Sequence, residues 1–411
     1  MRILQVNYND LQGHIFNGYD LHIALKKMGY DVKQMVKKKY SNCESVKSFC
    51  VDDICLLQLI EWEKKHSISH LMIPFGYGLK HSNEFMNADI IHYHILHNYA
   101  ISLFDYIDLM NKKLSVWTIH DAWIFTGNCI QPVECRQWTT GCSNCPLLNY
   151  GPFYMEQDNT NFMWNLKKQI ISQINPNIIV ASNFMKKYIE QSPITMHFDK
   201  IHIIPFGIDI EKYNIQIKKI CKWKYKISSY NKVIGFRSDD LFIKGCDFLY
   251  EALDKLEENL EVILICVGEG IIPKKIKKKY RIIELGWVYD EQQMIDFLEA
   301  VDIFVMPSLA EGFGLMAIEA MAAGCAIVCF KNTVLEEITN APSCGVAVEY
   351  KSSDALAMAI QSLLNQWDET ILRGKRGHEL ARKKYRFEDY VEKHKILYEE
   401  LYYKNYQNGV G

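Results

Sequence analysis

Short apolar runs alternate with amphipathic stretches along the whole chain. The apolar runs predict strands at Ile3–Asn7, Val32–Val36, Ile90–His94, Leu114–His120, Ile178–Ser182, Ile201–Ile204, Val233–Arg237, Val262–Val267, Ile282–Leu285, Ile303–Met306 and Ala326–Phe330. Many of these runs lack clean alternation, which is typical of parallel strands covered on both faces. Helical patterns fall between them, for example at Tyr19–Met28, Cys246–Glu258, Asp290–Ala300 and Asp354–Gln366. The repeated strand–helix units predict an α/β fold with doubly wound parallel sheets.

The strand–helix units form two series, which predict two Rossmann-like domains at residues 1–206 and 207–386. The segment between Phe206 and Asn231 is polar, lysine-rich and irregular, as expected of a join between domains. Residues 387–411 follow as a separate segment, and its stretch from Phe387 to Tyr406 is a predicted helix with many aromatic residues. We see no internal sequence repeat.

Composition narrows the class of protein. The chain has 411 residues, of which 49% are hydrophobic and 23% charged, as in an ordinary globular protein. The net charge of −2 implies no general attraction to nucleic acid. The longest apolar runs, such as Val262–Val267, are far too short to span a membrane, and the start of the chain lacks the apolar core of a secretory signal. The odd count of thirteen cysteines favours a reducing compartment, so we expect a cytoplasmic protein.

The segment from Pro307 to Phe330 is the most informative part of the chain. It places Glu311 and Glu319 eight positions apart, separated by the turn Gly312-Phe313-Gly314 and the start of an apolar helix. A strand, a glycine turn and a helix N-terminus can hold a phosphate, because backbone N–H groups converge there and the helix dipole favours negative charge. Glu319 lies in a helix that is apolar on nearly every side, so we expect a buried carboxylate that needs hydrogen-bond partners.

This segment resembles the E-x7-E region of the retaining glycosyltransferases of family 4, which have the two-domain GT-B fold. The resemblance implies transfer of a sugar from a nucleotide-sugar donor to a glycan or lipid-linked acceptor, without a catalytic metal, across a cleft between the two domains. It also implies that Glu319 binds ribose hydroxyl groups, while Glu311 and the amides of Phe313 and Gly314 hold the sugar. By analogy with this fold, residues 387–411 return to the first domain.

Other predicted donor-binding residues follow the strands of the second half. Arg237 ends a strand and Lys244 begins the next helix, where the family pattern G-R-x-x-x-x-K-G places its cations on the donor diphosphate. This chain departs from the pattern, because Phe236 is inserted between the glycine and the arginine and because the loop before Lys244 is longer. Gly268 and Gly286 follow two further strands and match the family's V-G-x-G and L-G-x-V segments near the nucleotide.

In the first half, Gly13 lies in the turn after the first strand, where the family often has a glycine-rich turn facing donor and acceptor. An ordinary strand–helix loop explains this turn equally well. His120 stands in a T-x-H-D context and matches the histidine that the family places on the transferred sugar; a partly buried structural histidine is the alternative. His92, His94 and His97 could in principle hold a metal, but the spacing alone gives such a site little support.

Four cysteines form a second unusual pattern within an insert at residues 121–148. Cys129, Cys135, Cys142 and Cys145 have the spacing C-x5-C-x6-C-x2-C in polar, glycine-containing sequence. Four thiolates suit a tetrahedral structural zinc, and C-x2-C is a common half-site; two disulfides and unliganded thiols are the alternatives. The surrounding text resembles a bacterial subset of the same glycosyltransferase family, in which the insert would shape the acceptor side.

Three lysine clusters, Lys37–Lys39, Lys186–Lys187 and Lys274–Lys279, are most simply solvated helix faces. Contact with anionic lipid headgroups at the inner face of the cell membrane is the alternative, and it suits a lipid-linked acceptor. The interpretation as a cytoplasmic glycosyltransferase of cell-surface polysaccharide synthesis, such as capsule or lipopolysaccharide, competes with two others. These are a GT-B-fold sugar-nucleotide epimerase and a catalytically silent, zinc-containing scaffold.

Overall fold

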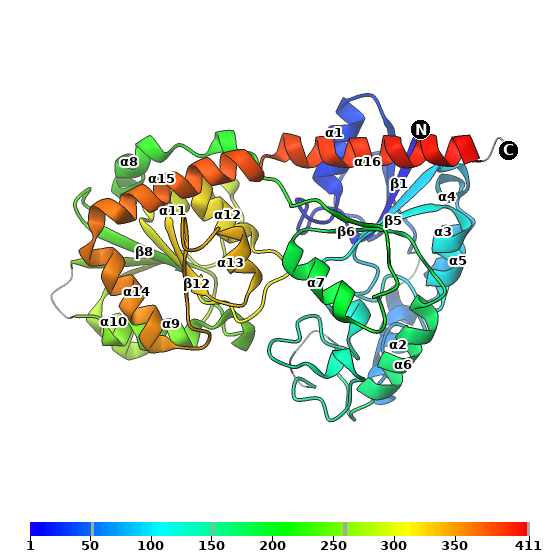
Figure 1. Ribbon diagram of the computed structural model, residues 1–411, viewed down its shortest axis with the longest axis horizontal. Helices are drawn as coiled ribbons and strands as arrows, with labels where there is room; N and C mark the ends of the chain where they lie inside the picture. The colour runs from blue at the N-terminus through cyan, green and yellow to red at the C-terminus, as the bar shows by residue number, and fades with distance from the viewer. Residues whose placement is uncertain (51–52, 149, 151–152, 258–260, 409–411) are drawn as a thin grey trace. The chain divides into compact units, whose positions relative to one another are not determined.

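The computed structural model describes residues 1–50, 53–148, 150, 153–257 and 261–408. The chain divides into two units (Figure 1). The first unit consists of Met1–Phe206 together with the chain from Tyr390 onward, and the second consists of Gly207–Asp389. Each unit is built around one parallel sheet.

The sheet of the first unit has the strand order β3-β2-β1-β4-β5-β6-β7, and every neighbouring pair is parallel. Its strands are β1 (Arg2–Asn9), β2 (Asp31–Lys38), β3 (Val46–Ser48), β4 (Ile90–Tyr93), β5 (Leu114–Thr118), β6 (Asn177–Val180) and β7 (Ile201–Ile203). The helices of this unit are α1 (Tyr19–Lys27), α2 (Asp53–Lys65), α3 (Phe75–Lys80), α4 (Asn83–Asn87), α5 (Asp105–Lys112), α6 (Thr160–Ile171) and α7 (Asn183–Gln191), with short 3-10 turns η1 (Trp123–Phe125) and η2 (Gln137–Thr139).

The last helix, α16 (Phe387–Asn408), contributes its residues from Tyr390 onward to the first unit. Tyr398 is fully buried, and its hydroxyl lies 2.5 Å from Nδ1 of His92 on β4. The Tyr30 hydroxyl, just before β2, donates to the carboxylate of Glu399. These contacts tie the C-terminal end of the chain to the first sheet.

The sheet of the second unit has the order β10-β9-β8-β11-β12-β13, again entirely parallel. Its strands are β8 (Lys232–Arg237), β9 (Val262–Val267), β10 (Arg281–Glu284), β11 (Ile303–Met306), β12 (Ala326–Phe330) and β13 (Val346–Val348). The helices are α8 (Lys218–Lys224), α9 (Cys246–Lys255), α10 (Lys274–Lys279), α11 (Glu291–Ala300), α12 (Leu315–Ala322), α13 (Val334–Ile338), α14 (Ser353–Asn365) and α15 (Trp367–Lys384), with 3-10 turns η3 (Ile210–Lys212), η4 (Ile215–Ile217) and η5 (Phe242–Lys244).

Both sheets therefore run third, second, first, fourth, fifth and sixth strand, with a seventh added in the first unit. This is the doubly wound order of a Rossmann-like domain, in which the sequence of strands reverses direction beside the first strand. The predicted α/β class with two Rossmann-like parallel sheets is confirmed. All eleven predicted strands lie at or within two residues of observed ones; the end of the predicted helix Cys246–Glu258 lies outside the described residues.

The sequence prediction missed the two short strands β3 and β13. Each has only three residues: β3 reads VKS, with two exposed positions, and β13 reads VAV, an apolar stretch too short to predict a strand. Their pairing partners are well-buried strands, which supply the burial that these segments lack by themselves. Over the residues that the structure describes, no helix combines the length and the apolar character needed to cross a bilayer.

The second sheet depends on a buried ion pair at its amino edge. Lys222 on α8 donates to Oδ2 of Asp302, just before β11, at 2.7 Å and to the carbonyl of Asn231 at 2.9 Å. The same carboxylate oxygen accepts the backbone N–H of Val233 on β8 at 2.9 Å. Both side chains are at most one-tenth exposed, so neither charge has water as an alternative partner.

We predict that Lys222→Met destabilises the second unit by about 3–5 kcal/mol, because it leaves the buried Asp302 charge unpaired. Urea unfolding followed by tryptophan fluorescence measures the effect. Lys255→Met is the control, since Lys255 pairs with Asp354 at the surface and both side chains are exposed. Equal stability of the two variants would contradict the role given to the buried pair.

Candidate functional site

The reversal of strand order in the second unit lies between β8 and β11, and polar side chains from the two following loops meet there. Nζ of Lys244, in η5 after β8, lies 2.7 Å from Oε1 of Glu311, in the loop after β11. The Ser308 hydroxyl donates to the same oxygen at 2.8 Å. Both members of the ion pair are mostly buried, with side chains 20% and 13% exposed. A cation and a carboxylate are thus held at the carboxyl end of the sheet, where open α/β sheets bind ligands.

Two backbone contacts bring these loops together. The N–H of Leu309 donates to the carbonyl of Ile243 at 2.8 Å, so the loop after β11 is bonded to η5. Gly245, which follows Lys244, has φ 65°, and a Cβ there would lie 2.0 Å from the carbonyl oxygen of Pro307. Only glycine allows both this left-handed backbone and this approach.

Arg237 lies at the end of β8 and is the second cation of the site. Its guanidinium pairs with Oδ2 of Asp239 at 2.7 Å and lies 5.3 Å from the centre of the Trp287 ring. The arginine is about one-third exposed and Trp287 about half exposed. Both groups are therefore accessible, and the arginine is oriented by a carboxylate on one side and an aromatic face on the other.

The predicted glycine turns are joined to each other. The N–H of Gly268, after β9, donates to the carbonyl of Gly286 at 2.7 Å. Both have positive φ, 97° and 65°, and a Cβ on Gly268 would lie 2.2 Å from the Ser238 carbonyl oxygen. Nothing lies within 4 Å of a Cβ on Gly286, so the space beside its Cα is open, whereas its carbonyl is occupied by the hydrogen bond from Gly268.

The turn Gly312-Phe313-Gly314 leads directly into α12. Gly314 has φ 99° and is the N-cap of the helix, where it supplies no side-chain acceptor for the first-turn amides. A Cβ on Gly314 would lie 2.5 Å from a methyl carbon of Leu335. Phe313 is buried, with its ring edge-on to Tyr385 at 6.1 Å. The first-turn N–H groups of the helix are therefore available to donate hydrogen bonds to an anionic ligand.

Glu319 is half-buried, so the expectation of a fully buried carboxylate is wrong. The helix α12 is buried through Ala317, Ile318 and Ala320–Ala322, but positions 315, 316 and 319 share one partly exposed face. Burial is the main effect that raises the pKa of the Tyr213 phenol, and the nearby Glu319 carboxylate raises it further.

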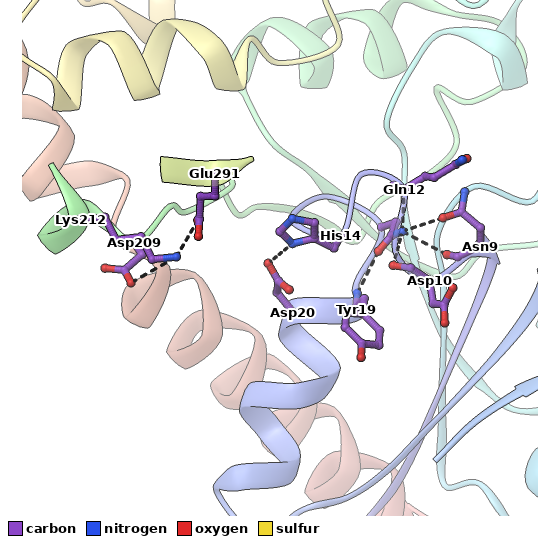
Figure 2. Close-up of polar contacts among 10 residues, drawn as sticks. Asn9, Asp10, Gln12, His14, Tyr19, Asp20, Asp209, Lys212 and Glu291 are labelled. Atoms are coloured by element: carbon purple, nitrogen blue, oxygen red, sulfur yellow. Dashed lines mark hydrogen bonds and ion pairs between the residues drawn. The ribbon is translucent and has the colours of Figure 1, made fainter. Parts of the chain in front are cut away.

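Lys212, next to Tyr213 in the sequence, is held by two acidic residues. It pairs with Glu291 at 2.6 Å and lies 4.0 Å from Asp209 (Figure 2).

In the first unit, the loop after β1 is held by one asparagine. Nδ2 of Asn17 donates to the carbonyls of Asn9, Asp10 and Gln12 at 2.8–3.1 Å (Figure 2 shows the cluster). Gly13 lies in this loop with φ 72°, and a Cβ there would collide with the Phe16 ring at 2.2 Å. The turn is thus rigid, and Gly13 is required by packing within the loop.

His120 lies two residues beyond the end of β5, in contact with aromatic rings. Its imidazole stacks on Phe206 with centroids 5.7 Å apart at 13°, and His94 lies 5.7 Å away. Nε2 of His120 is buried without a hydrogen-bond partner in the described structure. Burial lowers the pKa of His120 to about 4, outweighing the opposite effect of Asp121, so the ring is neutral at pH 7.

The neighbouring histidines do not gather as metal ligands. His92 bonds the Tyr398 and Thr118 hydroxyls, at 2.5 and 2.7 Å, and His97 pairs with Asp121 at 2.9 Å. Within the described residues, no group of three metal-ligating atoms that includes these histidines comes within 4.8 Å. His94 instead lies beside the loop after β1, since a Cβ on Gly18 would be 2.4 Å from its Nε2.

The four cysteines of the insert lie in one loop region of the first unit, but no three of their sulfurs come within 4.8 Å of one another in the described residues. Cys142 is buried, Cys129, Cys135 and Cys145 are partly buried, and none of the four is in a disulfide. Each of the six pairs is close enough for one thiolate to raise the pKa of the other. Burial, the larger effect, raises the pKa of Cys129 to about 12 and that of Cys142 to about 11. Cys266, Cys325 and Cys329 are buried in the core of the second unit.

Sequence reasoning missed several residues that shape the site. Ser308 and Asp239 orient Glu311 and Arg237, and Asn17 holds the first loop. Ser308 stands in the Pro-Ser pair that opens the E-x7-E segment, which is a usable signal. Asp239 lies in the lengthened loop after β8, which has no equivalent in the family pattern, so the pattern could not indicate that it pairs with Arg237.

Part of the second unit matches a known protein family. Residues 231–366 match the family model of glycosyl transferases group 1. The uncharacterized glycosyltransferase MJ1607 of Methanocaldococcus jannaschii is 28% identical over 41% of this chain and 46% of its own length. An Escherichia coli UDP-Gal:alpha-D-GlcNAc-diphosphoundecaprenol alpha-1,3-galactosyltransferase is 28% identical over 30% of this chain and 35% of its own. These matches show that the chain is similar to the group 1 glycosyl transferases.

The fold has solved counterparts. Sucrose-phosphate synthase from Thermosynechococcus elongatus aligns over 98% of this chain and 100% of its own, with a TM-score of 0.74 and 17% identity. At that identity the likeness concerns the fold, and it confirms the predicted pair of Rossmann-like units of the GT-B class. The chain spans about half the length of the first curated relatives it matches.

We predict that the first unit loses stability as the pH falls from about 6.5 to about 4. Burial, the largest effect, lowers the pKa of His22, His120 and His394 from 6.5 to about 4, so the unfolded chain takes up these protons first. Stability due to each neutral ring is complete above pH 6.5 and is lost on acidification, by about 3 kcal/mol per ring. His394→Leu should give a shallower dependence of the unfolding free energy on pH; an unchanged slope would contradict this account.

Proposed function

We propose that this protein is a retaining glycosyltransferase that moves a sugar, of the hexosyl type, from a nucleotide-sugar donor to a glycan or lipid-linked acceptor. The observation that carries the proposal is the meeting of Lys244 and Glu311 at the strand reversal of the second sheet, with Arg237 at the end of β8, the strand that leads to Lys244. The family match over residues 231–366 supports it, because that segment contains all three residues.

Arg237 and Lys244 are assigned to the donor diphosphate. When the bond from the sugar C1 to the phosphate oxygen breaks, negative charge grows on the departing diphosphate, and two nearby cations stabilise it. Charge-assisted hydrogen bonds of this kind are worth about 1.5–3 kcal/mol each. Both cations are paired with carboxylates, Asp239 and Glu311, so donor binding would exchange these partners for phosphate oxygens.

The remaining donor contacts are assigned by position. Glu311 and the amides at Phe313 and Gly314 bind sugar hydroxyls, and Glu319 on the partly exposed face of α12 binds the ribose. The turns at Gly268 and Gly286 approach the nucleoside, and the half-exposed Trp287 offers an aromatic face. The assignment requires no catalytic metal, because cationic side chains meet the diphosphate charge.

The first unit is assigned to the acceptor side, and His120 is its candidate for a sugar hydroxyl. A ring with a pKa of about 4 donates a hydrogen bond without adding charge at neutral pH. In the proposed step the acceptor oxygen bonds to C1 on the face that the leaving group departs from. Its proton passes to the departing phosphate oxygen, which preserves the anomeric configuration.

The acceptor class is proposed from one relative. The E. coli galactosyltransferase that this chain resembles is named for a UDP-Gal donor and a diphosphoundecaprenol-linked sugar acceptor. A comparable acceptor would place this enzyme on the cytoplasmic face of the cell membrane, in cell-surface polysaccharide synthesis such as capsule or lipopolysaccharide. The lysine-rich helix α10 is one surface that would contact anionic headgroups there.

We predict that Lys244→Ala lowers transfer by about 10- to 100-fold, because one charge-assisted contact to the diphosphate is lost. Glu319→Gln, which keeps the size of the side chain, should also lower transfer while the protein remains folded. Sugar transfer from a panel of UDP-, GDP- and ADP-sugars is followed by mass spectrometry. Lys255→Ala, which removes an exposed lysine of α9, is the control, and normal turnover in both site variants would refute the donor site.

The same panel separates the competing functions. An epimerase converts the donor when no acceptor is present, whereas the proposed transferase needs an acceptor to form product. A silent scaffold binds no sugar nucleotide, so UDP, GDP and ADP would leave its thermal unfolding temperature unchanged. The intact Glu311–Lys244 pair favours the transferase over the scaffold.

A further inference from the structure

The insert of the first unit contains a buried lysine that the proposed function does not use. Lys167 on α6 is fully buried, and its Nζ donates to the carbonyls of Trp123 and Thr126 at 2.5 and 3.0 Å. The same ammonium lies 3.7 Å from the centre of the Trp123 ring. Carbonyl dipoles and an aromatic face solvate the charge, but they do not neutralise it, and a buried charge without a counter-charge is costly.

Burial, the largest effect, lowers the pKa of Lys167 to about 7, and three acidic groups, Cys129, Cys142 and Asp121, oppose this shift. Asp121 already accepts from His97 at 2.9 Å and from the backbone N–H of Trp123 at 2.9 Å. The thiols therefore remain as the counter-charge, and they supply one only when they are ionised. Buried thiols with no metal stay protonated, whereas metal-bound cysteines are thiolates.

The loop that carries the four cysteines is built to hold its sulfurs. The backbone N–H of Gly127 donates to Sγ of Cys142 at 3.2 Å, the kind of amide contact that stabilises a thiolate. A Cβ on Gly127 would lie 2.6 Å from the Cβ of Thr160, so only glycine brings this amide to the sulfur. The N–H of Cys145 donates to Asp158 at 2.6 Å, and Trp138 donates to the Cys135 carbonyl at 2.9 Å.

We propose that Cys129, Cys135, Cys142 and Cys145 bind one zinc ion as a closed tetrathiolate site, with Lys167 as its buried counter-charge. Four thiolates and Zn²⁺ carry a net charge of −2, which the adjacent ammonium partly offsets. Four protein ligands leave no open position, so the metal is structural. It fastens the loop between β5 and α6 that follows His120.

Zinc binding would require the loop to contract around the ion. A tetrahedral site with Zn–S bonds of about 2.3 Å holds its sulfurs about 3.8 Å apart, whereas within the described residues no three of the four sulfurs lie within 4.8 Å of one another. The described group that does meet this spacing, Cys221, Asp296 and Glu299, is satisfied internally. The Cys221 thiol donates to Glu299 at 3.3 Å, and Asp296 pairs with Lys224 at 2.6 Å.

Metal analysis of the full-length protein, purified without chelators or a histidine tag, tests the site. We expect one zinc per chain by inductively coupled plasma mass spectrometry, and sulfur-to-cobalt charge-transfer absorption after replacement with Co²⁺. Cys135→Ser and Cys145→Ser should each lose most of the metal. The matched control is Cys43→Ser, which removes a partly buried thiol elsewhere in the first unit and should keep the metal.

Lys167→Met tests the counter-charge separately. We expect it to retain zinc but to yield it to a competing chelator at about tenfold lower chelator concentration, as outer-shell partners of metal sites do. A native protein with no zinc that also fails to take up Co²⁺ would overturn the proposal. Zinc that persists in both cysteine variants would overturn it as well, and native-state alkylation with intact mass would show whether disulfides or unliganded thiols stand there instead.

Discussion

The reversal of strand order beside the first strand of each sheet is the constraint on which the rest of the structure depends. Because successive helices cross to opposite faces at that point, the loops after β8 and β11 leave the sheet in different directions. The carboxyl edge between them is consequently left open for side chains that would be costly inside a domain. Lys244 and Glu311 occupy this position in the second unit, as the loop after β1 and His94 do in the first.

Close backbone approach turns that opening into a defined site. The bond from Leu309 to Ile243 and the absence of a side chain at Gly245 hold the two loops of the second unit against each other. Gly268 and Gly286 repeat the device one strand further along. All three glycines have positive φ, and at Gly245 and Gly268 an added Cβ would also lie near 2 Å from a carbonyl oxygen, so the shape of the site is encoded by glycine at these positions.

Sequence patterns predict those parts of the molecule that local chemistry determines. Fully buried strands such as β9 and β12 are continuous apolar runs, so they were found at their observed bounds. The strands β3 and β13, with three residues each, are too short to leave such a pattern. The exposure of Glu319 was misjudged for a similar reason, because an apolar helix does not reveal which of its faces the rest of the domain leaves uncovered. The pairing of Arg237 with Asp239 depends on how one long loop folds, which spacing does not specify.

The two cations of the second unit show why a preformed site costs little to keep. Arg237 and Lys244 each have a carboxylate partner at 2.7 Å, so neither charge is stranded when no ligand is bound. A dianionic ligand would replace one carboxylate by two or more charged oxygens at each cation, and the gain is the difference between the two arrangements. A released Glu311 would then be available, within the same loop, as an acceptor for neutral hydroxyl groups.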